Sequence, residues 1–225
     1  MKNKIICGCD DAGKGPMLGP MILAGVSIEE DKIEKLKEIG VKDSKLLSPK
    51  QREEIYKKII KIVKEYKIIK IRPKEIDEAV LSKTTNLNWL EADKMAEIIN
   101  SLKADKSIID CPSPNIIKFS AYVKNKLNVK TELVAEHKAE RFFPVGAASI
   151  LAKVTRDEEI EKIQKYIPYN IGSGYPSDPI TKKFLKEHGH EYPDIFRKSW
   201  ATYSRFQSNN SDKKDNLENT LELMT

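Results

Sequence analysis

Residues 4–28, KIICGCDDAGKGPMLGPMILAGVSI, decide how this chain is expected to fold. Two apolar runs, at residues 4–10 and 18–28, flank a segment rich in glycine and proline. This pattern predicts two strands joined by a turn and paired antiparallel. The first strand ends in adjacent carboxylates, Asp10 and Asp11, which repel each other and are costly to bury without a partner. A bound cation would offset that cost.

Downstream of this pair, apolar runs alternate with amphipathic stretches. Strands are predicted at residues 66–73, 106–110 and 130–137. Helices are predicted at residues 48–66, 85–103, 113–127 and 144–167. A glycine- and proline-rich loop at residues 169–179 precedes short helices that end near residue 206. The alternation indicates an α/β domain with a largely covered sheet.

Charge and composition narrow the class of protein. The 225-residue chain has a net charge of +6, which suits a partner with a phosphate backbone. Without an apolar run of about 18 residues or a signal peptide, we expect a cytoplasmic protein. The three cysteines are too few for a disulfide framework. Cys7 and Cys9 share a strand face and are interpreted as core residues, with metal binding as the less favoured alternative.

The segment GCDDAGKG nearly matches the phosphate-binding P-loop, because Gly8, Gly13 and Lys14 have the required spacing. Gly15, however, stands where that loop needs a hydroxyl for magnesium. The two aspartates would also repel phosphates, and prolines follow where a helix should begin. Nucleotide hydrolysis is therefore disfavoured.

The alternative is that carboxylates hold divalent cations. Asp110 ends the strand KSIID, and Glu140 lies between the last strand and the longest helix. Carboxylates that converge from separate segments can hold two ions for phosphodiester chemistry. Since adjacent strand residues face opposite sides, Asp11 is expected to curl around at the turn, which Gly13 and Gly15 permit. Spacing alone leaves open that each acid is an ordinary turn residue.

Five blocks of sequence then occur in a recognisable order. They are GCDDAGKGPMLGP (residues 8–20), VKDSKLLSPKQREEIYKKI (41–59), VAEHKAERFFPVGAASILAKVTRDEEIE (134–161), GSGYPSDPIT (172–181) and RKSWATYSRF (197–206). In these blocks the chain resembles type 2 ribonucleases H (ribonuclease HII), and EHKA and GSGYPSDP are most similar to the archaeal branch. The resemblance runs from about residue 4 to about residue 206.

The resemblance implies a ribonuclease H-like fold: a central five-stranded mixed sheet flanked by helices, with a helical C-terminal appendage. We expect a catalytic domain at residues 1–168, a substrate-contacting loop and appendage at 169–206, and a flexible tail at 207–225. The implied activity is endonucleolytic cleavage of the RNA strand of RNA–DNA hybrids, and 5′ to ribonucleotides embedded in duplex DNA. Two Mg²⁺ or Mn²⁺ ions would assist hydrolysis to 5′-phosphate and 3′-hydroxyl ends. Ribonucleotide excision and RNA primer removal are the implied roles.

Four acids match the family's catalytic and metal-binding positions: Asp10, Asp11, Asp110 and Glu140. Asp11 stands where the family usually has glutamate, and Glu140 where it usually has aspartate. We hypothesise that one lost and one gained methylene keep the total reach into the metal pair, with the ions shifted toward residue 11. Weakened binding of one ion is the alternative. A non-catalytic hybrid-binding protein with an impaired metal site is the corresponding rival function.

The resemblance also implies a set of substrate-binding residues: Gly13, Lys14, Gly15, Asp43, Ser44, Lys45, Ser149, Lys153 and Tyr175. The backbone of residues 13–15 would read the ribose 2′-hydroxyl. Lys14 replaces the usual arginine; it can still neutralise a phosphate but lacks the bidentate fork. Related type 3 enzymes carry Gly-Lys-Gly and prefer longer RNA tracts, so cleavage at single ribonucleotides is less firmly implied. Tyr175 would stack on the sugar after the ribonucleotide, which favours the type 2 preference.

Three further residues lie near these blocks. His137 is compatible with proton transfer or with a packing role. Arg156 and Asp157 are expected to form ion pairs on the helix surface, with Asp157 near the metals as an alternative.

The tail residues TLELMT lack the two neighbouring aromatics of the sliding-clamp motif of some archaeal relatives, so clamp binding by that route is not expected. The final residues NLENTLELM could instead form a short partner-binding helix. We expect a monomer.

Overall fold

A five-stranded mixed sheet forms the centre of the computed structural model, which describes residues 3–41 and 47–207. Its strands are β1 (Ile5–Ala12), β2 (Met21–Glu29), β3 (Glu65–Ile71), β4 (Lys106–Asp110) and β5 (Glu132–Glu136). Their order is β3-β2-β1-β4-β5. The β1–β2 and β2–β3 pairs are antiparallel, and β1–β4 and β4–β5 are parallel. The predicted fold class is confirmed.

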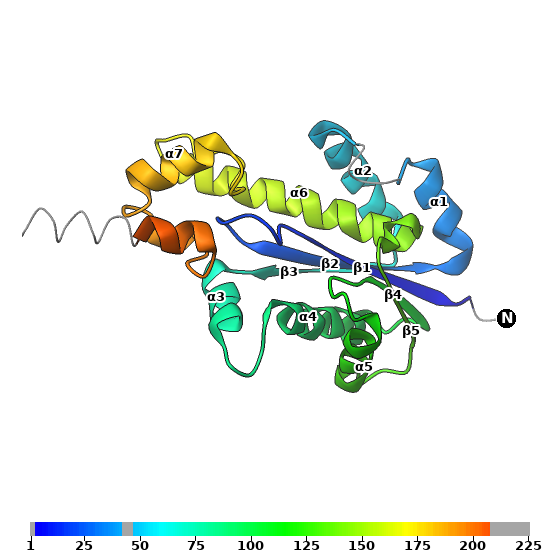
Figure 1. The fold of residues 1–225 in the computed structure, drawn as a ribbon. Coiled ribbons are helices and arrows are strands. Elements are labelled where there is room, and N and C mark those ends of the chain that lie inside the picture. The colour runs from blue at the N-terminus through cyan, green and yellow to red at the C-terminus, as the bar shows by residue number, and fades with distance from the viewer. Residues whose placement is uncertain (1–2, 42–46, 208–225) are drawn as a thin grey trace, which may run out of the picture.

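Helices cover both faces of this sheet (Figure 1). One face carries α1 (Ile33–Glu38), α2 (Pro49–Ile62) and α6 (Phe143–Tyr166), with the short 3-10 turn η1 (Glu30–Lys32). The other carries α3 (Pro73–Leu81), α4 (Leu87–Leu102) and α5 (Ile116–Lys126). Successive side chains of β1 point alternately toward the two layers of helices. Cys7 and Cys9 are buried on the side of α4 and α5. Their predicted role as core residues is confirmed.

The long helix α6 lies unusually close to β1 because glycine occupies the contact. A Cβ atom added to Gly8 would lie 2.2 Å from the backbone carbon of Pro144 and 2.3 Å from the backbone nitrogen of Val145. The small residues Ala147 and Ala148 of α6 are likewise fully buried. This close approach holds the first turn of α6 against the middle of β1, and the following turn brings Ser149 beside Asp10.

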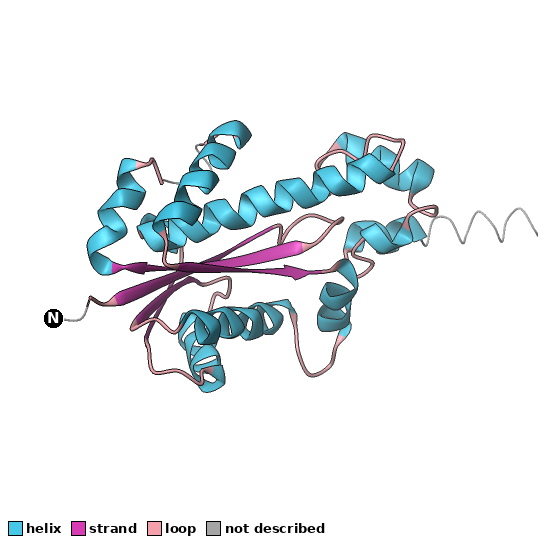
Figure 2. Ribbon diagram, turned by 180° about the vertical axis from the view of Figure 1, so that it is seen from behind, coloured by secondary structure: helices cyan, strands magenta, loops and turns pink. Residues whose placement is uncertain are grey.

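A C-terminal appendage follows α6 and packs on the loop between β1 and β2 (Figure 2). It contains α7 (Pro179–His188), the 3-10 turn η4 (Pro193–Ile195) and a helical segment at residues 201–207. Its core includes Phe184, Phe196 and Tyr203 together with Met17 and Leu18 of the β1–β2 loop. The appendage and this loop therefore form one packed unit.

Several boundaries differ from the sequence prediction by a few residues. Strand β1 continues through Ala12, and β3 begins at Glu65 because α2 already ends at Ile62. Helix α3 is missing from the prediction: Pro73 stops β3 and also begins this helix, where its lack of an N–H is harmless. In the described part of the chain, no helix has the length and apolar character needed to cross a membrane.

Candidate active site

The paired carboxylates lie within strand β1, one step before its end. Asp10 pairs with Ala24 and Asp11 pairs with Leu23, so the strand continues regularly past both. The expected curl of Asp11 at the turn is therefore wrong, because antiparallel pairing with β2 keeps the strand extended until Ala12. The two side chains still line a common cavity, which opens at this end of the sheet.

This cavity has a volume of about 520 Å³ and gathers the four predicted acids: Asp10, Asp11, Asp110 and Glu140. Asp110 reaches it because β4 runs parallel to β1 in the register Cys9–Ile109, which sets the next residues, Asp10 and Asp110, side by side. Glu140 reaches it from the 3-10 turn η3 (Ala139–Arg141). The N–H of Ala139 donates to Asp110 Oδ1 at 2.7 Å, which ties this turn to the end of β4.

Asp10 is the most enclosed of these acids, with 7% of its surface exposed. Its Oδ1 accepts the N–H of Asp11 at 2.8 Å, and the side chain of Ser149 also bonds to it. Lys153 Nζ donates to Ser149 Oγ at 2.9 Å, one turn further along α6. Helix α6 thus presents a hydroxyl to Asp10 and places a positive charge beyond it.

Burial and mutual repulsion disturb the titration of both aspartates. Burial, followed by the charge of Asp11, raises the pKa of Asp10 to about 8. Burial, followed by the charge of Glu91, raises the pKa of Asp11 to about 7. Within the described residues, no three His, Cys, Asp or Glu side chains converge as a ready-made metal site. The four acids nonetheless offer carboxylate oxygens to one cavity.

These shifts predict how stability depends on pH in protein stripped of divalent ions. Between the ordinary value of 3.8 and about 8, native Asp10 binds a proton that the unfolded chain has released. The free energy of unfolding therefore falls as the pH rises through this window. We expect Asp10→Asn to remove the penalty and to stabilise the stripped protein at pH 8 by on the order of 2 kcal/mol, or roughly 4–8 °C.

Thermal denaturation in a chelator at pH 5 and pH 8 measures this effect. The stabilising effect of Asp10→Asn should be largest at pH 8 and small at pH 5, where native Asp10 is mostly protonated. A melting temperature that falls with Asp10→Asn at pH 8 contradicts the prediction.

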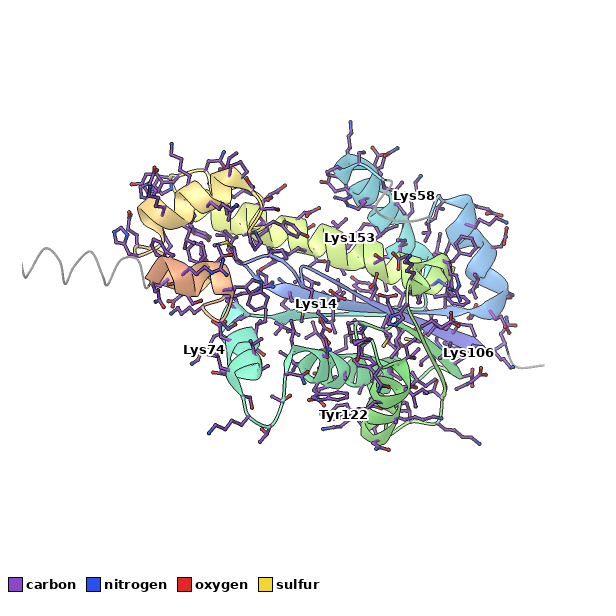
Figure 3. The ribbon with its side chains drawn as sticks, in the orientation of Figure 1. Lys14, Lys58, Lys74, Lys106, Tyr122 and Lys153 are labelled. Atoms are coloured by element: carbon purple, nitrogen blue, oxygen red, sulfur yellow. The ribbon has the colours of Figure 1, made fainter. Side chains whose placement is uncertain are left out.

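The turn after β1 begins at Gly13, whose φ of +84° favours glycine. Lys14 Nζ donates to Glu91 Oε2 and to Asn88 Oδ1 of α4, each at 2.8 Å (Lys14 is labelled in Figure 3). Glu91 is completely buried, and among the described residues its Oε1 has no hydrogen-bond partner. The expected role of Lys14 in neutralising a substrate phosphate stays a prediction; in this structure its ammonium pairs with the buried carboxylate of Glu91.

The remaining predicted contacts divide into three groups. Gly13, Lys153 and Tyr175 line the cavity, and Tyr175 is 48% exposed. A Cβ on Gly15 would lie 3.6 Å from the Tyr175 ring, so this tyrosine lies against the loop of residues 13–15. Ser149 is completely buried and bonds to Asp10 and Lys153, so its expected contact with nucleic acid is wrong. Asp43, Ser44 and Lys45 lie outside the described residues, as does the tail from residue 208.

Arg156 is buried, contrary to its expected place on the helix surface. Its Nη2 donates to the carbonyl of Leu18 at 2.7 Å. Asp157 does form an ion pair, with Arg52 at 3.1 Å, and lies on the wall of the cavity. His137 bonds through Nδ1 to the carbonyl of Cys111 at 2.9 Å, which favours a structural role.

Sequence reasoning missed several residues around this site. Arg52 and Lys138 line the cavity with positive charge, and Glu91 and Arg197 hold the turn after β1. Glu91 falls on the apolar face of the helix predicted at residues 85–103, and this placement was a signal that its carboxylate is buried. No local pattern marks the other three.

Comparison with known proteins fits this geometry. A model of the family described as ribonuclease HII matches residues 7–203. The chain belongs to the ribonuclease HII family. It is 46% identical over 224 residues to a ribonuclease HII of Thermococcus sibiricus, covering 96% of this chain and 97% of that protein. Ribonuclease HII proteins of this kind are enzymes of the ribonuclease H class, which cleave the RNA strand of RNA–DNA hybrids.

Solved structures of ribonuclease HII relatives share the fold. The crystal structure of ribonuclease H2 from Pyrococcus horikoshii matches with a TM-score of 0.83 and 42% identity, covering 91% of this chain and 98% of that one. The ribonuclease HII of Archaeoglobus fulgidus, solved in a complex with PCNA, matches with a TM-score of 0.79 and 37% identity over 87% of this chain and 95% of that one. The archaeal resemblance noted in the sequence is confirmed.

Proposed function

We propose that this enzyme cuts the RNA strand of hybrids, and also 5′ to single ribonucleotides in duplex DNA, by hydrolysis assisted by two divalent ions. Asp10, Asp11, Asp110 and Glu140 would hold Mg²⁺ or Mn²⁺. The observation that carries the proposal is the convergence of these carboxylates, from β1, β4 and η3, on one cavity. Products would carry 5′-phosphate and 3′-hydroxyl ends.

The residues present suit divalent ions of this kind. All four side chains offer carboxylate oxygens, which Mg²⁺ and Mn²⁺ prefer over nitrogen or sulfur. The raised pKa values of Asp10 and Asp11 mean that burial and neighbouring carboxylates disfavour their charged forms, which a bound cation would favour. When bound, such ions activate water and stabilise the charge that develops on the phosphodiester.

The chain's own residues would orient the reacting groups. Ser149 fixes the carboxylate of Asp10, and Lys153 beyond it adds positive charge on the cavity wall. Arg52 and Lys138 add further positive charge on the lining, which suits the phosphates of the scissile strand. Tyr175 is exposed beside Gly15 and would stack on a sugar. The residue 13–15 backbone would read the 2′-hydroxyl.

One assay tests this function most directly. Purified enzyme is given a duplex with one ribonucleotide and, separately, a long RNA–DNA hybrid, each with Mg²⁺, Mn²⁺ or chelator. We expect cleavage of both substrates with either ion, a 3′-hydroxyl at each cut, and none with chelator. Tight binding without divalent-dependent cleavage would favour the non-catalytic hybrid-binding alternative. Cleavage of the long hybrid alone would remove the single-ribonucleotide part of the proposal.

Relative to the usual family pattern, the side chain of residue 11 is one methylene shorter and that of residue 140 one methylene longer. This exchange gives a second test. If the two side chains compensate each other, Asp11→Glu and Glu140→Asp should each lower activity, by roughly tenfold, and the double variant should recover most of the loss. Cleavage rates titrated against Mg²⁺ and Mn²⁺ measure the coupling. Losses that simply multiply in the double variant would instead mean that one ion is weakly held.

The C-terminal tail bears on whether this protein binds a sliding clamp. The Archaeoglobus fulgidus relative was solved with PCNA. Here the tail lacks two neighbouring aromatics and lies outside the described residues, so the absence of clamp binding by that motif stays a prediction. A pull-down with a sliding clamp, comparing the full chain with one ending at residue 207, tests it.

A further inference from the structure

The C-terminal appendage holds every carbonyl of the loop at residues 13–15. Arg197 Nη2 donates to the carbonyl of Gly13 at 2.6 Å, and Arg197 Nη1 donates to that of Lys14 at 2.8 Å. Trp200 Nε1 donates to the carbonyl of Gly15 at 3.2 Å. The guanidinium of Arg197 also lies over the Trp200 ring, 5.0 Å from its centroid. Two residues more than 180 positions away therefore set this loop.

Holding the carbonyls fixes where the N–H groups point. In a trans peptide, the C=O of one residue and the N–H of the next point in opposite directions, and the described residues contain no cis peptide. The N–H groups of Lys14 and Gly15 therefore face away from Arg197 and its neighbours. Pro16 contributes no N–H. The loop can offer a ligand two donors from one side, while its acceptors are already used.

Further contacts make this support rigid. Arg197 is completely buried and also donates to the carbonyl of Gly19, from Nε at 3.2 Å and from Nη2 at 3.1 Å. Asp77 of α3 accepts the N–H groups of Lys198 and Ser199, each at 2.8 Å. The segment that carries Arg197 and Trp200 is thus anchored to the catalytic domain, and a small displacement of it would be transmitted to the loop.

We propose that Arg197, assisted by Trp200, is a positioning residue for ribonucleotide selectivity. It aims the Lys14 and Gly15 N–H donors at the 2′-oxygen and never touches the substrate itself. The inference rests on the proposed function, in which this loop reads the 2′-hydroxyl. A misplacement of about 1 Å can cost about 100-fold in an oriented site, so the fork geometry of the guanidinium matters as well as its charge.

The test measures selectivity separately from overall affinity. Arg197→Lys keeps the charge but loses the fork, and Trp200→Phe keeps an aromatic ring but loses the Nε1–H donor and part of the indole. Lys198→Ala is the matched control, because its side chain is exposed on the same segment and contacts no loop carbonyl. Each is placed in an Asp10→Asn background to block turnover. Dissociation constants are measured with Mg²⁺ for a duplex with one ribonucleotide and for the same duplex made only of DNA.

We expect the parent, which carries Asp10→Asn alone, to bind the duplex with one ribonucleotide roughly tenfold more tightly than the all-DNA duplex. This difference is the value of one or two hydrogen bonds. Arg197→Lys should bring this ratio close to one with little change in affinity for plain DNA. Trp200→Phe should lower the ratio by about threefold, and Lys198→Ala should leave it unchanged. A purely structural defect would weaken binding of both duplexes equally.

Two results overturn different claims. If the parent shows the preference and both variants keep it within twofold, Arg197 and Trp200 do not position the loop. If the parent itself shows no preference, the reading role of residues 13–15 in the proposed function fails instead. Should Arg197→Lys not fold, as judged by its melting temperature, the folded Trp200→Phe variant decides.

Discussion

Asp10→Asn is expected to abolish cleavage while leaving hybrid affinity within a few-fold of the parent. Asp10 is the acid that the cavity encloses most, and Ser149 of α6 bonds to its carboxylate. The asparagine side chain keeps the size and one oxygen but loses the charge that a divalent ion requires. Mutation of a residue that only supports a metal ligand typically lowers activity or metal affinity by about 10–100-fold. For Asp10 itself we therefore expect a loss of activity of roughly 10³-fold or more.

The matched control is Asp157→Asn. Asp157 lines the same cavity but pairs with Arg52, outside the proposed metal set. Its variant should keep activity within about tenfold, because an exposed ion pair contributes little. Single-turnover cleavage and equilibrium binding of the same hybrid separate catalysis from affinity. Near-normal turnover by Asp10→Asn would remove Asp10 from the metal site.

Gly8→Ala is expected to have the largest effect on stability. The added Cβ would lie 2.2 Å from the backbone of Pro144, and backbone atoms cannot move aside as a flexible side chain can. Helix α6 must shift away from β1, which also moves Ser149 and Lys153 relative to Asp10. Overpacking of this kind costs about 3 kcal/mol, which corresponds to a fall in melting temperature of roughly 10 °C.

Gly15→Ala serves as the comparison. Its Cβ would meet only the Tyr175 ring, at an ordinary 3.6 Å, and Gly15 is not among the described glycines with positive φ. We expect its melting temperature to stay within about 2 °C of the parent. Chemical denaturation of both variants, with activity measured on those that fold, checks the pair. Equal stabilities would show that α6 can move away from β1 at little cost.

Local pattern was enough to predict many of the strands and helices, whereas the set of four acids was implied by the family resemblance. The apolar runs around Asp10 and Asp110 predicted β1 and β4, and parallel pairing then places both acids at one edge of the sheet. The helix predicted from residue 48 begins as α2 at Pro49, where Ser48 Oγ accepts the N–H of Gln51. These features are local, so a few neighbouring residues carry the information.

The parts that the sequence did not predict depend on contacts between distant segments. The charge on Arg156 favours an exposed position on α6, yet it is buried against Leu18, 138 residues away. The ion pair between Lys14 and Glu91 was also missed, because the two residues are 77 positions apart and no local pattern relates them. Arg197 depends on the folded appendage in the same way. Such pairs need the packed chain, because neither partner's surroundings in the sequence specify the other.

The bonds from Arg197 to Gly13 and Lys14 also bear on how the protein is made. The acids of β1, β4 and η3 all precede residue 141, whereas the guanidinium that orders the turn belongs to residue 197 and is synthesised after all of them. A chain interrupted before residue 197 would contain all the acids without the support that sets its selectivity. The turn after β1 is thus held in place by a segment that is synthesised only after all four acids.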